Sequence, residues 1–313
     1  MSARRLYLGI DGGQSGTTAL IADESGRVIG RGRGGPCNHV SSDEGRAKFR
    51  DAVLGCIQQA CLGARLDAQT VAFVSACLGF SGGPEDKESY SRELIRSDRY
   101  KITHDAEIAL SGATAGQPGV IVIAGTGSMA FGRNATDRSA RAGGWGYVFG
   151  DEGGAFDIVR RALRAALKYE EGWGEPTALY DLLLRETKSQ DANQLLHLFY
   201  APEYGRSRVA ALCPLITEAA EQDLVARQII NAAAADLSRY VEAVFRQLFR
   251  PGETVPVSYI GGVFRSALLL DVFKSCVRNS IACDPTQPHF GPAEGAVFEA
   301  LRLDGNAAQL ILS

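Results

Sequence analysis

Twice in this chain of 313 residues, a short glycine turn connects one apolar strand pattern to another. The first turn follows residues 6–11 and precedes residues 17–23. The second follows residues 120–124 and precedes residues 129–132. Phosphate loops of the Rossmann and P-loop types connect a strand to a helix, and neither of their glycine spacings occurs at these turns. The pattern therefore predicts a duplicated α/β fold in which each half begins with strand, glycine turn and strand.

Apolar spacing also predicts the elements that follow each pair of strands. In residues 43–63, an apolar side chain recurs every fourth position from Phe49 to Cys61, as in an amphipathic helix. Gln117-Pro118-Gly119 interrupts the pattern, so we place a domain boundary there. The other expected elements are strands at 27–32, 71–79, 100–103 and 257–260, and helices at 84–95, from 105, within 153–250, at 266–277 and at 293–303.

Composition and charge remove several classes of function. Hydrophobic residues make up 45% and charged residues 22% of the chain, which are ordinary values for a globular protein. With 33 basic and 36 acidic side chains, the net charge is −3, without the basic excess of a nucleic-acid-binding protein. No apolar stretch approaches the roughly 18 residues of a membrane span, and the N-terminus lacks the apolar run of a signal peptide.

The cysteines indicate a reducing compartment. There are 7 of them, none in CxxC spacing, and several lie in apolar runs such as FVSACLGF. An odd number of buried thiols is typical of a cytosolic protein with reduced core cysteines. The pattern argues against a zinc site, and against any iron–sulfur cluster other than one shared between subunits.

The first glycine turn carries groups that suit a phosphate accompanied by a metal ion. It reads DGGQSGT, with Asp11 at the end of the strand. Glycines let backbone N–H groups approach an anion closely, and hydroxyl groups add donors. Because a carboxylate repels a phosphate, Asp11 implies an intervening Mg²⁺. A glycine-rich hairpin in which Asp11 is a local acceptor explains the same residues without a function.

Two further glycine turns suggest a nucleotide. The turn Gly125-Thr126-Gly127-Ser128 has the character of the first, and two matching turns suit the two sides of a polyphosphate. Gly261-Gly262, before a helix, is either a plain turn or a contact to a base or ribose. None of the three turns contains a lysine, so amides, a metal ion and helix N-termini would have to balance the phosphate charge.

Two acidic segments suggest a substrate site. Asp105 follows a strand and opens a helix, where it is either an N-cap or a general base, and the pattern does not choose between these roles. The segment GGWGYVFGDEGG at 143–154 suits a pocket wall, with aromatic faces and exposed amides for a polar ligand such as a sugar. Alternatively, Asp151 and Glu152 simply favour the first turn of the following helix.

In this order, DGGQSGTT, THDAEIALSGA, IAGTGS, GGWGYVFGDEGGAF and YIGGVFRS resemble the BadF/BadG/BcrA/BcrD ATPase family, and within it the N-acetylglucosamine kinases. The resemblance covers essentially the whole chain. It implies the fold of the actin, sugar kinase and heat-shock chaperone superfamily, with two RNase H-like lobes around a cleft for ATP and substrate. The lobes would be 1–117, joined by the C-terminal helix 292–313, and 118–291. The implied reaction transfers the γ-phosphate of ATP, with Mg²⁺, to O6 of an amino sugar, foremost N-acetylglucosamine.

The resemblance also implies roles for single residues. Asp11 would hold Mg²⁺, and Asp105 would be the general base that takes the proton from the sugar 6-hydroxyl. The nucleotide would contact Gly13, Ser15, Gly16, Thr17, Thr126, Gly127, Ala211, Gly261, Gly262 and Val263. The sugar would contact Asn38, Asp105, Ser128, Met129, Trp145, Gly146 and Asp151. The chain departs from the family pattern at Gln14-Ser15, where glycines are common, and at Ala211, where a glycine is expected.

Other functions remain open at this point. The sugar is alternatively glucosamine, N-acetylmuramic acid or another hexose, because the sequence does not place the contacts that set selectivity. In a different class, the protein would be an ATPase that activates a partner enzyme. The glycine-flanked cysteine of that branch is missing here, and so are the helix-turn-helix and zinc motifs of related repressors. We expect a cytoplasmic homodimer that binds neither nucleic acid nor membrane.

Overall fold

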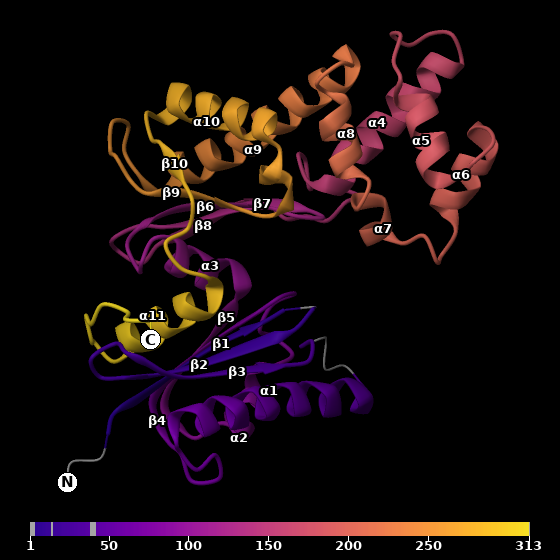
Figure 1. The fold of residues 1–313 in the computed structure, drawn as a ribbon. Coiled ribbons are helices and arrows are strands. Elements are labelled where there is room, and N and C mark those ends of the chain that lie inside the picture. Colours follow the sequence, from indigo (N-terminus) through magenta and orange to yellow (C-terminus); the bar gives the residue numbers. More distant parts are fainter. Residues whose placement is uncertain (1–3, 14, 38–41, 313) are drawn as a thin grey trace. The chain divides into compact units, whose positions relative to one another are not determined.

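The computed structural model describes residues 4–13, 15–37 and 42–312 (Figure 1). The chain divides into two compact units. Unit 1 consists of Met1–Gln117 and Pro288–Ser313, and unit 2 consists of Pro118–Gln287. Each unit contains one five-stranded sheet, and helices pack on both sheets. The expected α/β class with two RNase H-like lobes is confirmed.

The sheet of unit 1 has the order β3-β2-β1-β4-β5. Neighbours among the first three strands are antiparallel, whereas β4 and β5 continue the sheet parallel to β1. The parallel register aligns Gly12, Phe80 and His104, so the carboxyl ends of β1, β4 and β5 share one edge. The strands are β1 (Leu6–Gly12), β2 (Thr17–Asp23), β3 (Val28–Gly34), β4 (Phe73–Phe80) and β5 (Ser97–His104).

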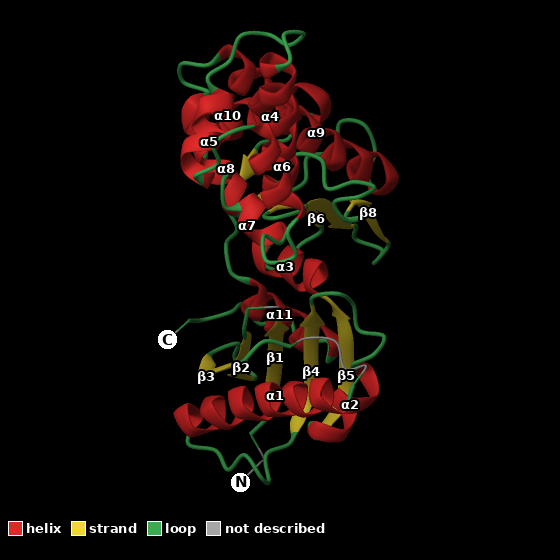
Figure 2. Ribbon diagram, turned by 90° about the vertical axis from the view of Figure 1, so that its right-hand side faces the viewer, coloured by secondary structure: helices red, strands yellow, loops and turns green. Residues whose placement is uncertain are grey.

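Helices cover both faces of this sheet (Figure 2). Helix α1 (Asp43–Ala64) lies against one face, and its backbone approaches β3 closely. A Cβ atom at Gly32 would lie 1.9 Å from the carbonyl oxygen of Cys56, so only glycine permits this packing. Helices α3 (Asp105–Ala113) and α11 (Pro292–Leu303) cover the other face, and the short helix α2 (Glu88–Leu94) contacts α1.

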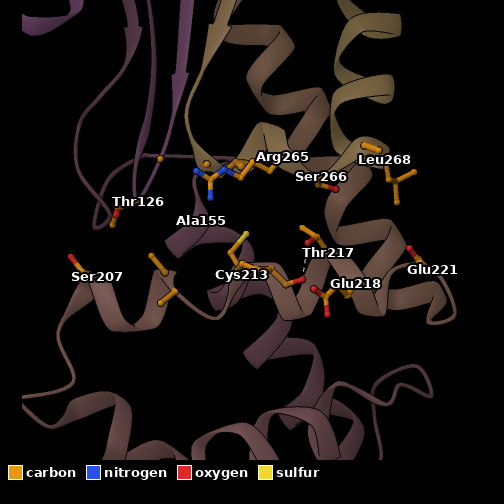
Figure 3. Close-up of a pocket in the computed structure, with 17 residues that line it drawn as sticks. Thr126, Ala155, Ser207, Cys213, Thr217, Glu218, Glu221, Arg265, Ser266 and Leu268 are labelled. Atoms are coloured by element: carbon orange, nitrogen blue, oxygen red, sulfur yellow. Dashed lines mark hydrogen bonds between the residues drawn. The ribbon is translucent and has the colours of Figure 1, made fainter. Parts of the chain in front are cut away.

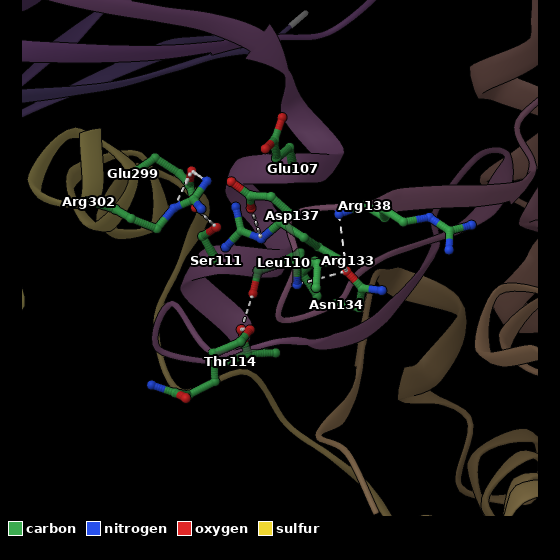
Figure 4. A network of polar contacts seen from close by, with 12 residues as sticks. Glu107, Leu110, Ser111, Thr114, Arg133, Asn134, Asp137, Arg138, Glu299 and Arg302 are labelled. Carbon is green, nitrogen blue, oxygen red and sulfur yellow. Dashed lines mark hydrogen bonds and ion pairs between the residues drawn. The ribbon is translucent and has the colours of Figure 1, made fainter. Parts of the chain in front are cut away.

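Polar contacts hold the C-terminal helix, α11, against the rest of unit 1. Glu299 of α11 is 1% exposed and accepts a hydrogen bond from the Ser111 hydroxyl of α3 (Figure 4). Arg302 pairs with the same carboxylate at 2.8 Å. Lys101 of β5 lies 2.5 Å from Glu299 and 2.6 Å from Glu107. The final helix is therefore held to β5 and α3 by paired buried charges as well as by apolar contacts.

The sheet of unit 2 has the order β10-β9-β6-β7-β8 and repeats the strand–turn–strand beginning. Its strands are β6 (Gly119–Ala124), β7 (Ser128–Arg133), β8 (Ser139–Gly143), β9 (Val257–Ile260) and β10 (Pro285–Thr286). Its helices are α4 (Ala155–Glu170), α5 (Leu179–Thr187), α6 (Ala192–Tyr200), α7 (Arg206–Ala210), α8 (Cys213–Ala219), α9 (Leu224–Leu248), the 3₁₀ helix η1 (Gly262–Arg265) and α10 (Ala267–Ile281).

Most expected elements are present, and the differences have local causes. Strands β8 and β10 were not expected, because β8 lacks an apolar run and β10 is two residues long. The helix expected at 84–95 begins only at Glu88, because Pro84 opens a turn that the Lys87 amide closes. Six of the seven cysteines are buried, as expected for core thiols. Within the described residues, no helix has the length and apolarity needed to cross a membrane.

Candidate functional site

The first glycine turn is a tight hairpin between β1 and β2. The Gly13 amide donates to the Gly16 carbonyl at 2.9 Å, and the Cys37 amide donates to the Gly13 carbonyl at 3.0 Å. The Thr17 hydroxyl donates to the Gly35 carbonyl at 2.7 Å and lies 2.8 Å from the Cys37 sulfur. Thr17 is 2% exposed, so its hydroxyl holds the turn against the end of β3. Ser15 is the exposed hydroxyl of this turn.

At the first glycine turn, close packing and not a positive φ selects glycine. Neither Gly13 nor Gly16 has the positive φ that favours glycine. Gly12 does require its missing side chain, because a Cβ atom there would lie 2.4 Å from the Phe80 ring. Close contact between β1 and β4 is therefore what selects glycine at the strand end.

Asp11 lies at the carboxyl edge of the unit 1 sheet, among other carboxylates. Burial raises the pKa of Asp11 to about 6, with further contributions from the negative charges of Asp105 and Glu294. Glu294 stands in the first turn of α11 and pairs with Arg31 at 2.5 Å. A half-buried carboxylate beside two others is a favourable place for a cation, because a bound cation removes the repulsion.

The residues present fit Mg²⁺ held with few protein ligands. Among the described residues, no group of three or more His, Cys, Asp or Glu side chains is arranged to hold a metal ion. Mg²⁺ usually keeps several waters and takes one or two carboxylates together with substrate phosphates. Asp11 is therefore suited to contribute one ligand, directly or through water.

Asp105 is the first residue of α3, immediately after β5. The N-cap position belongs to His104, whose side chain makes no capping hydrogen bond. One carboxylate oxygen of Asp105, Oδ1, accepts from the Ala106 amide at 2.8 Å. Its other oxygen, Oδ2, makes no hydrogen bond to any described residue. The half-buried Asp105 carboxylate therefore keeps one oxygen available for a ligand at the edge where Asp11 lies.

The second glycine turn, in unit 2, is tied to the start of α4. The Gly125 amide donates to the Gly127 carbonyl at 2.9 Å. The amides of Ala155 and Phe156 donate to the carbonyls of Gly125 and Thr126 at 2.9 and 3.1 Å. The turn is thus fixed on a 16-residue helix, whose N-terminus favours negative charge.

A cavity of about 690 Å³ opens beside this turn within unit 2 (Figure 3). This volume suits a nucleotide-sized ligand, since typical ligand pockets measure roughly 300–1,000 Å³. Gly261 has φ +123° and lies so close to β6 that a Cβ atom would be 2.1 Å from the Ala124 carbonyl oxygen. The residues that line the cavity are Gly125, Thr126, Ala155, Ser207, Ala210, Ala211, Cys213, Pro214, Thr217, Glu218, Glu221, Gly262, Val263, Arg265, Ser266, Ala267 and Leu268.

Four of the expected nucleotide residues line this one cavity: Thr126, Ala211, Gly262 and Val263. Gly127 and Gly261 lie next to lining residues without lining it. The cavity also contains charges that the sequence did not single out. The exposed Arg265 makes no hydrogen bond or ion pair with the described residues, and its guanidinium extends into the cavity (Figure 3).

The loop between β8 and α4 contains three of the expected sugar residues, Trp145, Gly146 and Asp151, whereas Ser128 and Met129 begin β7. Asp151 is 4% exposed, has φ +63°, and accepts a hydrogen bond from Arg206. The Ser128 hydroxyl donates to the Glu152 carbonyl at 2.6 Å, which ties the start of β7 to this loop. Trp145 is 65% exposed and lies under the guanidinium of Arg141, at 4.6 Å from the ring centroid.

Met129 and Gly146 complete the expected sugar residues that the structure describes. A Cβ atom at Gly144 would lie 3.3 Å from the Met129 side chain, so this side chain packs under the start of the loop. Gly146 has φ +79° and accepts hydrogen bonds from the amides of Phe149 and Gly150. Asn38 lies outside the described residues.

The sequence did not identify several residues that the structure brings to these places. Arg206 lies beside Asp151 and Gly127, and Arg265 lies in the cavity. Glu294 lies near Asp11, and the Tyr240 hydroxyl donates a hydrogen bond to the Glu152 carboxylate. Arg206, Tyr240 and Glu294 lie outside the quoted motifs, whereas Arg265 belongs to the segment YIGGVFRS, in which only the glycines and Val263 were assigned a role.

Comparisons with known proteins show the family of this chain. The model of the BadF/BadG/BcrA/BcrD ATPase family matches residues 8–300. An N-acetylmuramic acid/N-acetylglucosamine kinase of Clostridium acetobutylicum is 35% identical over 280 residues, covering 86% of this chain and 89% of the relative. An N-acetyl-D-glucosamine kinase of Dictyostelium discoideum is 30% identical over 315 residues, covering 96% and 98%.

A solved structure extends the likeness to the fold. A candidate N-acetylglucosamine kinase from Chromobacterium violaceum superposes with a TM-score of 0.74 at 26% identity. The superposition covers 94% of this chain and 98% of that chain.

Proposed function

Because this chain belongs to the BadF/BadG/BcrA/BcrD ATPase family, we propose that it is an ATP-dependent kinase that phosphorylates O6 of an amino sugar, foremost N-acetylglucosamine. The observation that carries the proposal is that the Clostridium and Dictyostelium relatives, aligned over more than four fifths of the chain, are named as kinases of N-acetylated amino sugars. N-acetylmuramic acid is the second candidate substrate, because the Clostridium relative is named for both sugars.

The nucleotide is assigned to the cavity of unit 2. Gly262, Val263 and Ala211 would surround the adenosine, and Thr126 would place the phosphates at the second glycine turn. The N-terminus of α4, which fixes this turn, favours the negative charge of the phosphates. In unit 1, Gly13, Ser15, Gly16 and Thr17 would form the first phosphate turn, with Thr17 acting through the turn it holds in place.

The sugar is assigned to Asp105 and to the loop that contains Asp151. Trp145 offers an exposed aromatic face, and the Asp151 carboxylate offers an acceptor for sugar hydroxyls. Ser128, Met129 and Gly146 would border the sugar, and Asn38 is assigned with them from the family pattern.

Asp105 is assigned the proton transfer. Its carboxylate would take the proton of the 6-hydroxyl while O6 forms a bond to the γ-phosphorus and the bond to the β,γ-bridging oxygen breaks, which releases ADP. When bound at Asp11, Mg²⁺ would supply charge neutralisation at the phosphates. Positioning of the two substrates would contribute much of the remaining acceleration.

The test is ADP release by the purified protein with Mg²⁺ and ATP, with and without N-acetylglucosamine. Strong stimulation by the sugar is expected, and 6-deoxy-N-acetylglucosamine, which lacks the accepting hydroxyl, should give none. Stimulation only by N-acetylmuramic acid, glucosamine or glucose would keep the chemistry and replace the substrate. ATP hydrolysis that no sugar affects would contradict the kinase assignment and favour an activator of a partner enzyme.

We also propose a cytoplasmic location and a homodimer. The buried free thiols support the first, because such cysteines persist in reducing compartments. The homodimer rests on the family resemblance, and light scattering coupled to size-exclusion chromatography would test it.

A further inference from the structure

We propose that Arg206 is a positioning residue of the sugar site, which fixes the Asp151 carboxylate in the orientation that receives the sugar hydroxyls. The inference rests on the proposed function, since it assigns Asp151 a role in sugar binding. It adds a residue that lies 55 positions away in the sequence and belongs to none of the glycine motifs.

The first observation is the ion pair itself. Arg206 donates from Nη2 to Oδ2 of Asp151. The Asp151 side chain is 5% exposed, whereas that of Arg206 is 36% exposed. The aspartate is thus enclosed, and its orientation depends on the partner that approaches it from the open side. A charge-assisted hydrogen bond of this kind is stronger and more directional than a neutral one.

The second observation is the contact of this pair with the second glycine turn. A Cβ atom at Gly127 would lie 2.4 Å from Oδ2 of Asp151 and 2.5 Å from Nη2 of Arg206. Both charged groups therefore pack directly on the turn assigned to the phosphates. The missing side chain of Gly127 provides the space for the ion pair.

The third observation is that Arg206 also contacts the aromatic loop. Its guanidinium lies 5.4 Å from the ring centroid of Tyr147. Tyr147 in turn packs edge-on against Phe156 at 5.1 Å, and Arg160 donates to the Tyr147 carbonyl at 3.1 Å. Arg206 thus bridges the glycine turn and the loop that presents Trp145 and Asp151.

The fourth observation is that this arrangement is not optimised for stability. Asp151 adopts φ +63°, a backbone conformation that non-glycine residues rarely take. Nε of Arg206 is buried and has no hydrogen-bond partner among the described residues. Strained backbone and unsatisfied buried donors are concentrated at functional sites, where orientation matters more than stability.

The place of Arg206 in the chain connects it to the nucleotide cavity. Arg206 is the first residue of α7, and Ser207, Ala210 and Ala211, which follow it, line the cavity. One short helix therefore contacts both the sugar loop and the nucleotide cavity. A shift of α7 would therefore change the orientation of the Asp151 carboxylate through the ion pair with Arg206.

The test compares Arg206→Ala, Arg206→Lys and Arg208→Ala in the sugar-dependent ADP-release assay. Arg208 is the matched control, because it lies on the same helix, is exposed and makes no hydrogen bond or ion pair with the described residues of the sugar loop. Arg206→Ala should raise the sugar KM about tenfold or more, the loss expected from a charge-assisted hydrogen bond, and change kcat less. Arg206→Lys should recover part of the affinity, and Arg208→Ala should behave as wild type.

A double-mutant cycle distinguishes positioning from a general structural effect. Asp151→Asn combined with Arg206→Ala should have nearly the sugar KM of Asp151→Asn alone, because Arg206 acts through Asp151. Additive increases in the sugar KM in the double variant would overturn the inference. So would an unchanged sugar KM in Arg206→Ala and Arg206→Lys proteins that are folded. Both results would leave the kinase assignment intact. Absence of sugar-stimulated turnover in the wild type would overturn both.

Discussion

The carboxylate of Asp11, at the end of β1, lies in the electrostatic field of Asp105, at the start of α3. The parallel register of β1, β4 and β5 brings these residues to one edge although 94 positions separate them in the sequence. The negative charge of Asp105, which we assign to proton transfer, therefore helps to raise the pKa of Asp11, which we assign to the metal ion.

The first prediction concerns Asp11 and pH. Burial and the neighbouring carboxylates raise the pKa of Asp11 from 3.8 to about 6. The folded protein thus binds this proton more tightly than the unfolded chain, and stability is lost as pH rises from about 4 to about 6. Without Mg²⁺, the free energy of unfolding of wild type relative to Asp11→Asn should fall over this range by up to about 3 kcal/mol. Urea titrations at several pH values would measure it, and a constant difference would contradict the shift.

The second prediction concerns Asp105. Asp105→Asn should lower kcat by orders of magnitude and change the sugar KM little, because the amide keeps the size of the side chain but accepts no proton. Steady-state kinetics in the ADP-release assay would separate the two constants. Asp51→Asn, at an exposed position on α1, is the matched control. Near-wild-type turnover of Asp105→Asn would remove Asp105 from the proton transfer.

The third prediction concerns the space at Gly127. Gly127→Ala should displace the Asp151–Arg206 pair and raise the sugar KM, because the added Cβ atom would lie within 2.5 Å of both charged groups. Gly205→Ala is the control, since a Cβ atom there would meet nothing within 4 Å. Equal kinetics for both alanine variants would show that the turn accommodates the extra atom.

The fourth prediction concerns Arg265. Arg265→Ala should raise the KM for ATP severalfold and leave the sugar KM nearly unchanged, because its guanidinium faces the nucleotide cavity and has no partner among the described residues. Arg164→Ala removes an exposed arginine from α4 that does not line the cavity. If both variants have the wild-type KM for ATP, Arg265 does not contact the nucleotide.

The fifth prediction concerns the ion pairs that hold α11 against β5 and α3. Lys101→Met would leave the carboxylates of Glu107 and Glu299 without this cation and should destabilise the protein by about 3 kcal/mol, the range for breaking a buried pair. Lys48→Met removes an exposed pair with Glu44 and should destabilise the protein much less, because water and salt screen such pairs. Thermal unfolding of the two variants would compare them, and equal losses would contradict the buried network.

Local patterns in the sequence determined the elements of this protein. Apolar runs and glycine turns placed the paired strands β1–β2 and β6–β7, because strand and turn preferences act over a few residues. The family motifs selected Thr126, Ala211, Gly262 and Val263, which line one cavity. Short strands such as β10 escaped prediction, because pairing with a neighbour holds them in place and no apolar run marks them.

Tertiary structure alone decided which charges meet. Arg206 reaches Asp151 only because α7 packs beside the glycine turn, and Glu294 comes near Asp11 only because α11 packs on the sheet of unit 1. From the sequence, the Thr17 hydroxyl is expected to donate a hydrogen bond to a phosphate. In the structure, the pairing of β2 with β3 directs this hydroxyl to the Gly35 carbonyl. A residue's secondary structure depends mainly on its neighbours in the chain, whereas its charge partners depend on packing between segments that lie up to hundreds of residues apart.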